Sequence, residues 1–255
     1  MREIESAGRP ANIIGIDLGT TETMVARLNE SGRAEITNNA EGMHVTPSVV
    51  RIDESGSVIV GSEAKKFLGL GEPNVFAEFK REMGTDRTWH VARRQVGPVE
   101  LSALLLKKVV EDYSMQFGPP TAIGITWPAN YRNEQREATK DAATMAGLTN
   151  LFFIEAPTAA ALCFAAHSDL DGTYLIYDFG GNTFEVTLIE AKDGDIRILY
   201  QDGVQQLGAI DLDNALLKLV AEKYFAEIGE EFDAAGCCFS RNELERLRHG
   251  LSSQR

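Results

Sequence analysis

The sequence predicts a soluble α/β protein in which antiparallel hairpins feed mixed sheets. Three observations favour this class: strand-like apolar segments alternate with longer amphipathic stretches, glycine-containing turns separate them, and one strand–turn–strand segment occurs twice. The 255 residues are 44% hydrophobic and 25% charged, a composition typical of a globular chain with one large or two modest cores. No apolar run approaches the roughly 18 residues that a membrane span needs.

The formal net charge of −13 argues against a nucleic-acid surface, which needs clustered basic residues to displace counterions. It does not exclude a nucleotide, because a divalent cation and backbone amides can neutralise phosphate locally. Residues 1–11 are polar and lack an apolar signal segment, so we expect a flexible tail in a cytoplasmic protein without a membrane partner. The three cysteines show no metal-binding spacing, which favours reduced thiols in a reducing compartment.

The N-terminal part is predicted to be rich in short strands. An apolar run at residues 13–16 ends at Asp17, and residues 23–28 alternate polar and apolar side chains as a half-buried strand does. Asn29-Glu30-Ser31-Gly32 has the composition of a hairpin turn. The elements that follow are strands at residues 34–37, 48–52 and 58–60, a turn at 53–56, and a short helix at 62–68.

The rest of the chain alternates helices with strands. Residues 101–117 form a long amphipathic pattern that Gly118-Pro119-Pro120 ends, and the apolar strand at 122–127 ends at Pro128. Further helices are predicted at residues 133–146, 158–166, 212–228 and 241–251. Further strands are predicted at residues 151–154, 173–177, 184–189 and 195–200, the last three as a meander.

The repeated segment carries the first functional signal. When IIGIDLGTTETMVARL is laid on YLIYDFGGNTFEVTLI, Asp17 falls on Asp178, Gly19 on Gly180, and a second strand follows each turn. A match in strand, turn and return strand indicates a duplicated unit, one per lobe. Two such turns facing each other would place two carboxylates and two glycine-containing amide loops around a shared cleft.

This pairing of carboxylates with small, hydroxyl-bearing residues suits a phosphate and metal site. Glycine lets backbone N–H groups approach an oxygen anion, and threonine hydroxyls add donors. A carboxylate beside phosphate makes sense only through a hydrated Mg²⁺, since like charges about 4 Å apart repel by roughly 4 kcal/mol at an effective dielectric of 20. The alternative is that Asp17 and Asp178 are solvated turn residues. The chain contains no P-loop, no G-x-G-x-x-G and no protein-kinase catalytic loop.

With these residues in place, the sequence resembles the ATPase domain of the heat-shock-70 (DnaK-type) chaperones, within the actin-like ATPase superfamily. Residues 15–21, GIDLGTT, are similar to that family's first phosphate loop, and residues 178–184, DFGGNTF, to its second. The resemblance covers about residues 12–252 and implies an actin-like (ribonuclease H-like) α/β fold with two lobes around a nucleotide cleft. The intervening motifs, in family order, are Thr46-Pro47-Ser48, Val60-Gly61 with Ala64, Phe79-Lys80-Arg81, Trp127-Pro128-Ala129, Gln135-Arg136 with Ala138 to Ala142, and Pro157 to Ala161.

The resemblance implies a role for each matching residue. Lys80 matches the lysine that orients the attacking water, Thr20 lies nearest the reacting phosphate, and Asp178 helps to position water. The implied ligands are ATP or ADP with Mg²⁺, held through water by Asp17 and Asp178, and potassium as a further cation. Pro128 and Arg136 match the pair that relays nucleotide state to a partner domain. The other implied nucleotide-binding residues are Gly19, Thr21, Gly180, Gly181, Asn182, Thr183, Gly208, Glu245, Arg248 and Ser252.

Several positions depart from the family pattern. The family's Asn-Glu-Pro-Thr is Glu155-Ala156-Pro157-Thr158 here, so the glutamate that contacts metal-bound water is replaced by Ala156 and Glu155 is expected to point elsewhere. Asn182 replaces the third glycine of the second loop, and asparagine tolerates a left-handed backbone. Glu185 replaces an aspartate, and His249 stands where a basic residue caps the adenosine.

The resemblance divides the chain into a first lobe at residues 12–170, with a reduced upper sub-domain at about 47–100, and a partial second lobe at residues 171–255. Because the family's ATPase domain continues beyond the adenosine helix, we expect a C-terminally truncated second lobe whose meander has an uncovered face and edge. In the intact protein the implied partners are a peptide-binding domain, co-chaperones and unfolded client proteins.

Two functions remain open at this point. The first is an ATP-hydrolysing module of a molecular chaperone, which acts by positioning and electrostatic stabilisation. The second is a nucleotide- or protein-binding regulator that has lost efficient hydrolysis, favoured by Ala156 and the incomplete lobe. A sugar-kinase-like transferase is a third and weaker hypothesis.

Overall fold

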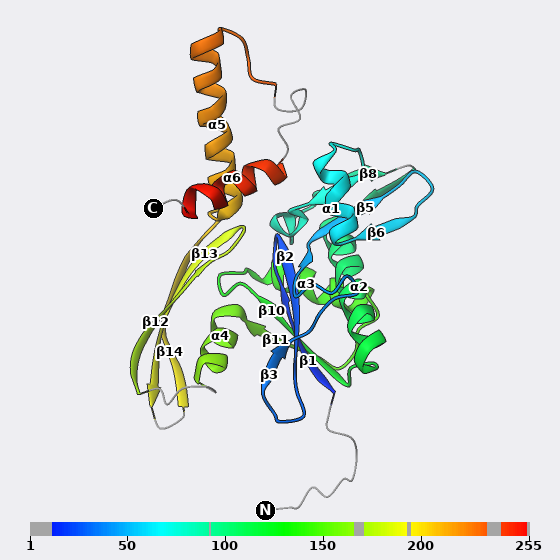
Figure 1. Cartoon of the computed structure of the whole chain (residues 1–255). Coiled ribbons are helices and arrows are strands. Elements are labelled where there is room, and N and C mark those ends of the chain that lie inside the picture. Colours follow the sequence, from blue (N-terminus) through cyan, green and yellow to red (C-terminus); the bar gives the residue numbers. More distant parts are fainter. Residues whose placement is uncertain (1–11, 92, 166–170, 193–194, 234–240, 254–255) are drawn as a thin grey trace, which may run out of the picture.

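The computed structural model describes residues 12–91, 93–165, 171–192, 195–233 and 241–253 (Figure 1). The tail predicted for residues 1–11 lies outside these ranges, as do Cys237 and Cys238. Within the described ranges, no helix combines the length and the apolar character needed to cross a membrane.

A six-stranded mixed sheet forms the centre of the molecule, in the order β11-β10-β1-β2-β3 with β4 paired to β2. Strands β1, β10 and β11 run parallel, whereas β2 is antiparallel to β1, β3 and β4. The mixed sheet predicted from the sequence is therefore confirmed. Its strands are β1 (Ile13–Leu18), β2 (Glu22–Leu28), β3 (Ala34–Ile36), β4 (Thr46–Pro47), β10 (Ala122–Trp127) and β11 (Leu151–Glu155).

The repeated segment forms two hairpins with the same register. Asp17 pairs with Met24 in the β1–β2 hairpin, and Asp178 pairs with Glu185 between β12 (Gly172–Phe179) and β13 (Thr183–Lys192). The two aspartates therefore occupy equivalent positions near the ends of their strands, immediately before a glycine-containing turn. The predicted duplication is confirmed at the level of strand, turn and return strand.

A smaller antiparallel sheet and its helix lie at one end of the central sheet (Figure 1). Its order is β6-β5-β7, and the predicted turn between β5 and β6 closes through a hydrogen bond from Gly56 N–H to the Asp53 carbonyl. The elements are β5 (Val49–Ile52), β6 (Val58–Val60), α1 (Ser62–Gly69) and β7 (Val75–Ala77), followed by the one-turn 3₁₀ helix η1 (Phe79–Glu82) and the hairpin of β8 (Trp89–Val91) and β9 (Arg94–Val96). The sequence analysis missed β4, β7, η1, β8 and β9.

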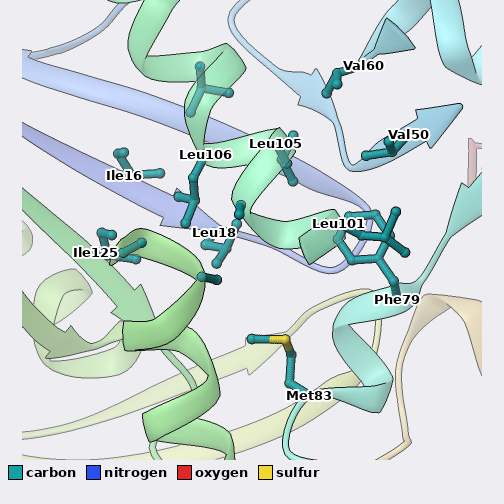
Figure 2. Close-up of a cluster of buried hydrophobic side chains, with 14 of the residues drawn as sticks. Ile16, Leu18, Val50, Val60, Phe79, Met83, Leu101, Leu105, Leu106 and Ile125 are labelled. Carbon is teal, nitrogen blue, oxygen red and sulfur yellow. The ribbon is translucent and has the colours of Figure 1, made fainter. Parts of the chain in front are cut away.

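The main hydrophobic core lies between the central sheet and α2 (Pro98–Phe117), against which α3 (Asn133–Met145) packs. Leu101, Leu105 and Leu106 of α2 belong to one buried cluster with Ile16, Leu18 and Ile125 of the sheet, and Figure 2 shows Leu101 beside Phe79. Phe79 and Met83 extend this core, and each is almost completely buried. Because Phe79 begins η1 and Met83 follows its last residue, the core fixes the position of the residues between them.

The C-terminal part contains a three-stranded meander, β12-β13-β14, with β14 at Asp195–Gln205. Helix α4 (Ala156–Ala165) lies between this sheet and the central one and contacts strands of both (Figure 1). The opposite face of the meander carries exposed Leu175, Tyr177 and Tyr200, which confirms the expected uncovered face. Helices α5 (Ala209–Ile228) and α6 (Arg241–Ser253) follow.

Candidate functional site

The first glycine turn, between β1 and β2, is held by the motif at residues 46–48. Ser48 N–H donates to the Thr21 carbonyl at 2.9 Å, and Ser48 Oγ donates to the Gly19 carbonyl at 2.9 Å. A Cβ atom on Gly19 would lie 2.0 Å from the Glu22 carbonyl oxygen, so only glycine fits this position. The turn therefore has a fixed backbone that presents Thr20 and Thr21.

The second turn packs against the start of α5. Gly180 N–H closes the turn on the Thr183 carbonyl at 2.9 Å, and Gly180 O accepts from Ala209 N–H at 3.0 Å. A Cβ on Gly208 would lie 2.5 Å from the Gly181 carbonyl, so Gly208, predicted to bind nucleotide, packs against the second turn and is not among the described residues that line the two cavities of this site. A Cβ on Gly181 would lie 2.7 Å from Cγ2 of Thr21, so the two glycine turns face each other at close range.

Lys80 lies in η1 and points into the space between the turns. Its side chain is 6% exposed, and its ammonium donates a hydrogen bond to the Leu18 carbonyl. Burial lowers the pKa of Lys80 from 10.5 to about 8, although Asp17, Glu185 and Asp178 each pull it upward. Lys80 is therefore a buried lysine close to carboxylates, not a solvated surface lysine.

Three carboxylates face Lys80. Burial raises the pKa of Asp178, and the negative charge of Asp17 adds to that effect. Burial also raises the pKa of Glu185, which sits directly across the hairpin from Asp178 and accepts a hydrogen bond from Asn130 N–H at 3.1 Å. Asp17 accepts a hydrogen bond from Thr126 Oγ1 at 2.6 Å. Against one lysine, this excess of negative charge favours a cation.

Two cavities meet at the first turn. One is acidic and is lined by Asp17, Lys80, Asp178 and both glycine turns. The other has a volume of about 150 Å³, the size of a cavity that accepts a benzene ring, and includes the apolar side chains of Leu68, Ile210, Leu217 and Leu244. Thr20 and Thr21 line both cavities. The pair suits one elongated ligand with a charged end and a flat apolar end.

Most of the predicted nucleotide-binding residues line one of these cavities. Thr183 and the glycines of the two turns border the acidic cavity, whereas Glu245 and Arg248 of α6 border the apolar one. Glu245 is paired with Lys65 at 3.0 Å and Arg248 with Asp213 at 2.6 Å. Ser252 is exposed in the last turn of α6, donates to the Arg248 carbonyl, and is not among the described residues that line either cavity.

Glu155 and Ala156 lie as expected, with Ala156 at the acidic cavity and Glu155 directed elsewhere. One carboxylate oxygen of Glu155 pairs with Arg136 at 3.1 Å, and the other accepts from Gln201 of β14 at 3.1 Å. Arg136 also lies over the Trp127 ring, 5.3 Å from its centroid, and donates to the Ala129 carbonyl. Arg136 is therefore held beside Pro128, its predicted partner.

Sequence reasoning missed the site role of Glu185, although it noted the residue. The sequence did contain a signal for this role, because the repeat places Glu185 at the position that pairs with Asp178 across the hairpin. It also gave a wrong reason for Asn182. Asn182 is not among the described non-glycine residues with positive φ, so its position does not call for glycine-like backbone freedom. The tight contacts at Gly181 and Gly208 determine this loop instead.

The residues present fit a magnesium-bound nucleotide. Among the described residues, no three His, Cys, Asp or Glu side chains form a group that could hold a metal ion directly. The glycine turns leave room that a Cβ would fill, and threonine hydroxyls lie where the two cavities join. Two ion pairs, Arg81–Asp211 and Lys65–Glu245, connect the elements on either side of the site.

The chain is similar to known chaperones. The family model described as Hsp70 protein matches residues 13–97 and 88–255. The protein named Chaperone protein DnaK from Thermotoga neapolitana is 37% identical over 238 residues, which is 92% of this chain and 39% of that protein. The protein of the same name from Thermosipho africanus is 34% identical over 252 residues, 97% of this chain and 42% of that protein.

The chain thus spans about two fifths of the length of the curated relatives it matches, with 39% for the first and 42% for the second. The family match covers the central sheet, both glycine turns and helices α5 and α6. Together with the mixed sheet and the duplicated hairpin, it confirms the actin-like ATPase fold that the sequence predicted. This chain belongs to the Hsp70 protein family.

Proposed function

We propose that this chain is the nucleotide-binding domain of a heat-shock-70-type molecular chaperone, and that it binds and hydrolyses ATP with Mg²⁺. The observation that supports this most is the joining of an acidic cavity to an apolar one at Thr20 and Thr21. Each end of such a site matches one end of a nucleoside triphosphate. In this proposal the apolar cavity takes the adenosine and the acidic cavity takes the phosphates.

The chain's own residues would position the reaction rather than form covalent bonds. A bound Mg²⁺ would supply charge neutralisation of the phosphates, with Asp17 and Asp178 binding its water ligands. Lys80, fixed by the core on either side of η1, would hold the attacking water near the terminal phosphate. Thr20 would donate a hydrogen bond to that phosphate, and Asp178 would accept one from the water. Potassium is proposed as a further cation.

A second function is favoured by Ala156. Its side chain has no hydrogen-bonding group, yet it lines the acidic cavity, and the neighbouring Glu155 is occupied by Arg136 and Gln201. A chain without a carboxylate at this position can bind nucleotide and hydrolyse it poorly. The alternative is therefore a nucleotide- or protein-binding regulator that has lost efficient hydrolysis.

Phosphate release under single-turnover conditions separates the two functions. The first function predicts turnover that Lys80→Ala abolishes while Mg-ATP still binds, because Lys80 acts on water rather than on adenosine. The second predicts tight binding without turnover in the wild type. Lys218→Ala, which alters an exposed lysine of α5, is the matched control and should leave both quantities unchanged.

We also propose the setting of this domain. By analogy with the relatives it would act in the cytoplasm with a peptide-binding domain, co-chaperones and unfolded client proteins. Arg136 supports a role in signalling, because it joins α3 to the end of β11, where Ala156 meets the acidic cavity. Pull-down with a permanently unfolded protein, with and without ATP, tests for clients, and binding that ignores nucleotide would count against this setting.

A further inference from the structure

Asn182 is a buried polar side chain in the second glycine turn whose hydrogen-bonding capacity is not used. It is 7% exposed, and its amide oxygen is fully buried with no hydrogen-bond partner. The residue lines the acidic cavity together with Lys80 and Asp178. A buried amide oxygen without a partner is costly, because it has given up its hydrogen bonds to water without replacement. Such a group is ready to bind a polar ligand.

The position of Asn182 along the site indicates which part of a ligand it would meet. It borders the acidic cavity but not the apolar one, whereas Thr20 and Thr21 border both. An elongated nucleotide placed with its base in the apolar cavity would pass the threonines first. Its outermost phosphate would then lie in the cavity that Asn182 shares with Lys80.

The chemistry of the amide suits that end of the ligand. An amide has N–H donors for a phosphate oxygen and a carbonyl acceptor for a cation-bound water, whereas a carboxylate only accepts and an ammonium only donates. The neighbouring carboxylates in their ionised form cannot donate to phosphate, and the Lys80 ammonium, which gives one of its three donors to the Leu18 carbonyl, cannot accept from a water. Asn182 is therefore suited to meet a phosphate oxygen and a water ligand at once.

We propose that the Asn182 side chain is a specificity-determining ligand for the terminal phosphate, so that this chain prefers a nucleoside triphosphate over the diphosphate. This inference rests on the proposed function, because it assumes that nucleotide binds across the two cavities. In this proposal a side chain of the second glycine turn binds phosphate in addition to the backbone N–H groups of that turn. The amide N–H would donate a charge-assisted hydrogen bond to the phosphate, while the amide oxygen, buried without a partner, gains an acceptor role toward a water ligand of the cation.

Calorimetric titration of the full chain with Mg-ATP and with Mg-ADP tests the proposal. Asn182→Ala should weaken Mg-ATP binding by about tenfold, the equivalent of one hydrogen bond to a charged group, and leave Mg-ADP binding unchanged. Asn182→Asp, which replaces the donor with a negative acceptor, should weaken Mg-ATP binding further. Thr187→Val is the matched control, since it removes another buried group without a partner, from the same strand pair but outside both cavities.

Thermal unfolding without nucleotide separates binding from a structural role. Asn182→Ala should not lower the unfolding temperature, because the residue removed has an unpartnered amide. An equal loss of affinity for both nucleotides, no loss for either, or a lower unfolding temperature would overturn the inference. If the wild type binds neither nucleotide, the proposed function fails as well, whereas wild-type binding with an unaltered ATP preference in Asn182→Ala overturns this inference alone.

Discussion

Replacing Lys80 by methionine should stabilise the fold at neutral pH and remove the proposed ATP hydrolysis. Burial lowers the pKa of Lys80 from 10.5 to about 8, so the charged form is penalised by about 3 kcal/mol at about 1.4 kcal/mol per pH unit. Methionine fills similar space without the charge, but leaves the Leu18 carbonyl without its donor, which costs about 1 kcal/mol. The free energy of unfolding should therefore rise by about 2 kcal/mol at pH 7.

The stability gained by Lys80→Met should depend on pH. Because the folded-state pKa lies below the unfolded one, the penalty is complete below about pH 8 and disappears as the pH rises toward 10.5. The advantage of Lys80→Met over the wild type should therefore shrink between these values. Urea unfolding of both proteins at pH 7 and near pH 10 measures it, with Lys218→Met, an exposed lysine, as control. A destabilised Lys80→Met at pH 7 would refute the reasoning.

Three further outcomes are expected. Gly19→Ala should lose about 3 kcal/mol of stability in chemical unfolding, because its Cβ would lie 2.0 Å from the Glu22 carbonyl oxygen; an unchanged midpoint contradicts this. Thr187→Val should gain about 1 kcal/mol in the same assay, because it removes a buried hydroxyl without a partner, and a loss would show that the hydroxyl is bonded. Glu155→Ala should speed amide hydrogen exchange in β14 around Gln201, because it removes the contact between β11 and β14. Glu137→Ala, which breaks only an exposed ion pair with Lys140, should leave that exchange unaltered. Equal exchange rates in the two variants would show that the Glu155–Gln201 hydrogen bond does not stabilise β14.

The duplicated hairpin shows what a sequence can predict. Register in a hairpin is set locally, by the alternation of side chains and by the turn. Equal spacing around Asp17 and Asp178 was therefore enough to predict two equivalent strand ends. The facing of the two turns also followed, because duplicated units that share a site place their equivalent ends together. The division into lobes at residue 170 stays a prediction.

Lys80 shows what local pattern cannot predict. Its burial depends on Phe79 and Met83 packing against α2, whose residues lie further along the chain. The strands β8 and β9 were missed because three residues are too few to show an alternating pattern. Asn182 was judged by backbone preference, whereas contacts at Gly181 and Gly208 with distant residues decide the shape of its loop.

The departures from the family pattern were visible in the sequence, but their consequences were not. Ala156 and Glu155 stand next to each other, and only the fold shows that one lines the cavity and the other holds Arg136. Glu155 is the last residue of β11 and Ala156 is the first residue of α4, so substitutions at these two neighbours change both the lining of the cavity and the ion pair beside it. This is a physical reason to measure turnover and binding separately.

The central claim is that the acidic and apolar cavities form one site for a magnesium-bound nucleotide. Calorimetric titration of the full chain with ATP, in magnesium and then in excess EDTA, tests it most directly, with adenosine as a competitor. We predict saturable binding at one site that weakens strongly without magnesium and that adenosine reduces. Binding that is indifferent to magnesium, or no binding by a chain whose circular dichroism shows it folded, would contradict the claim.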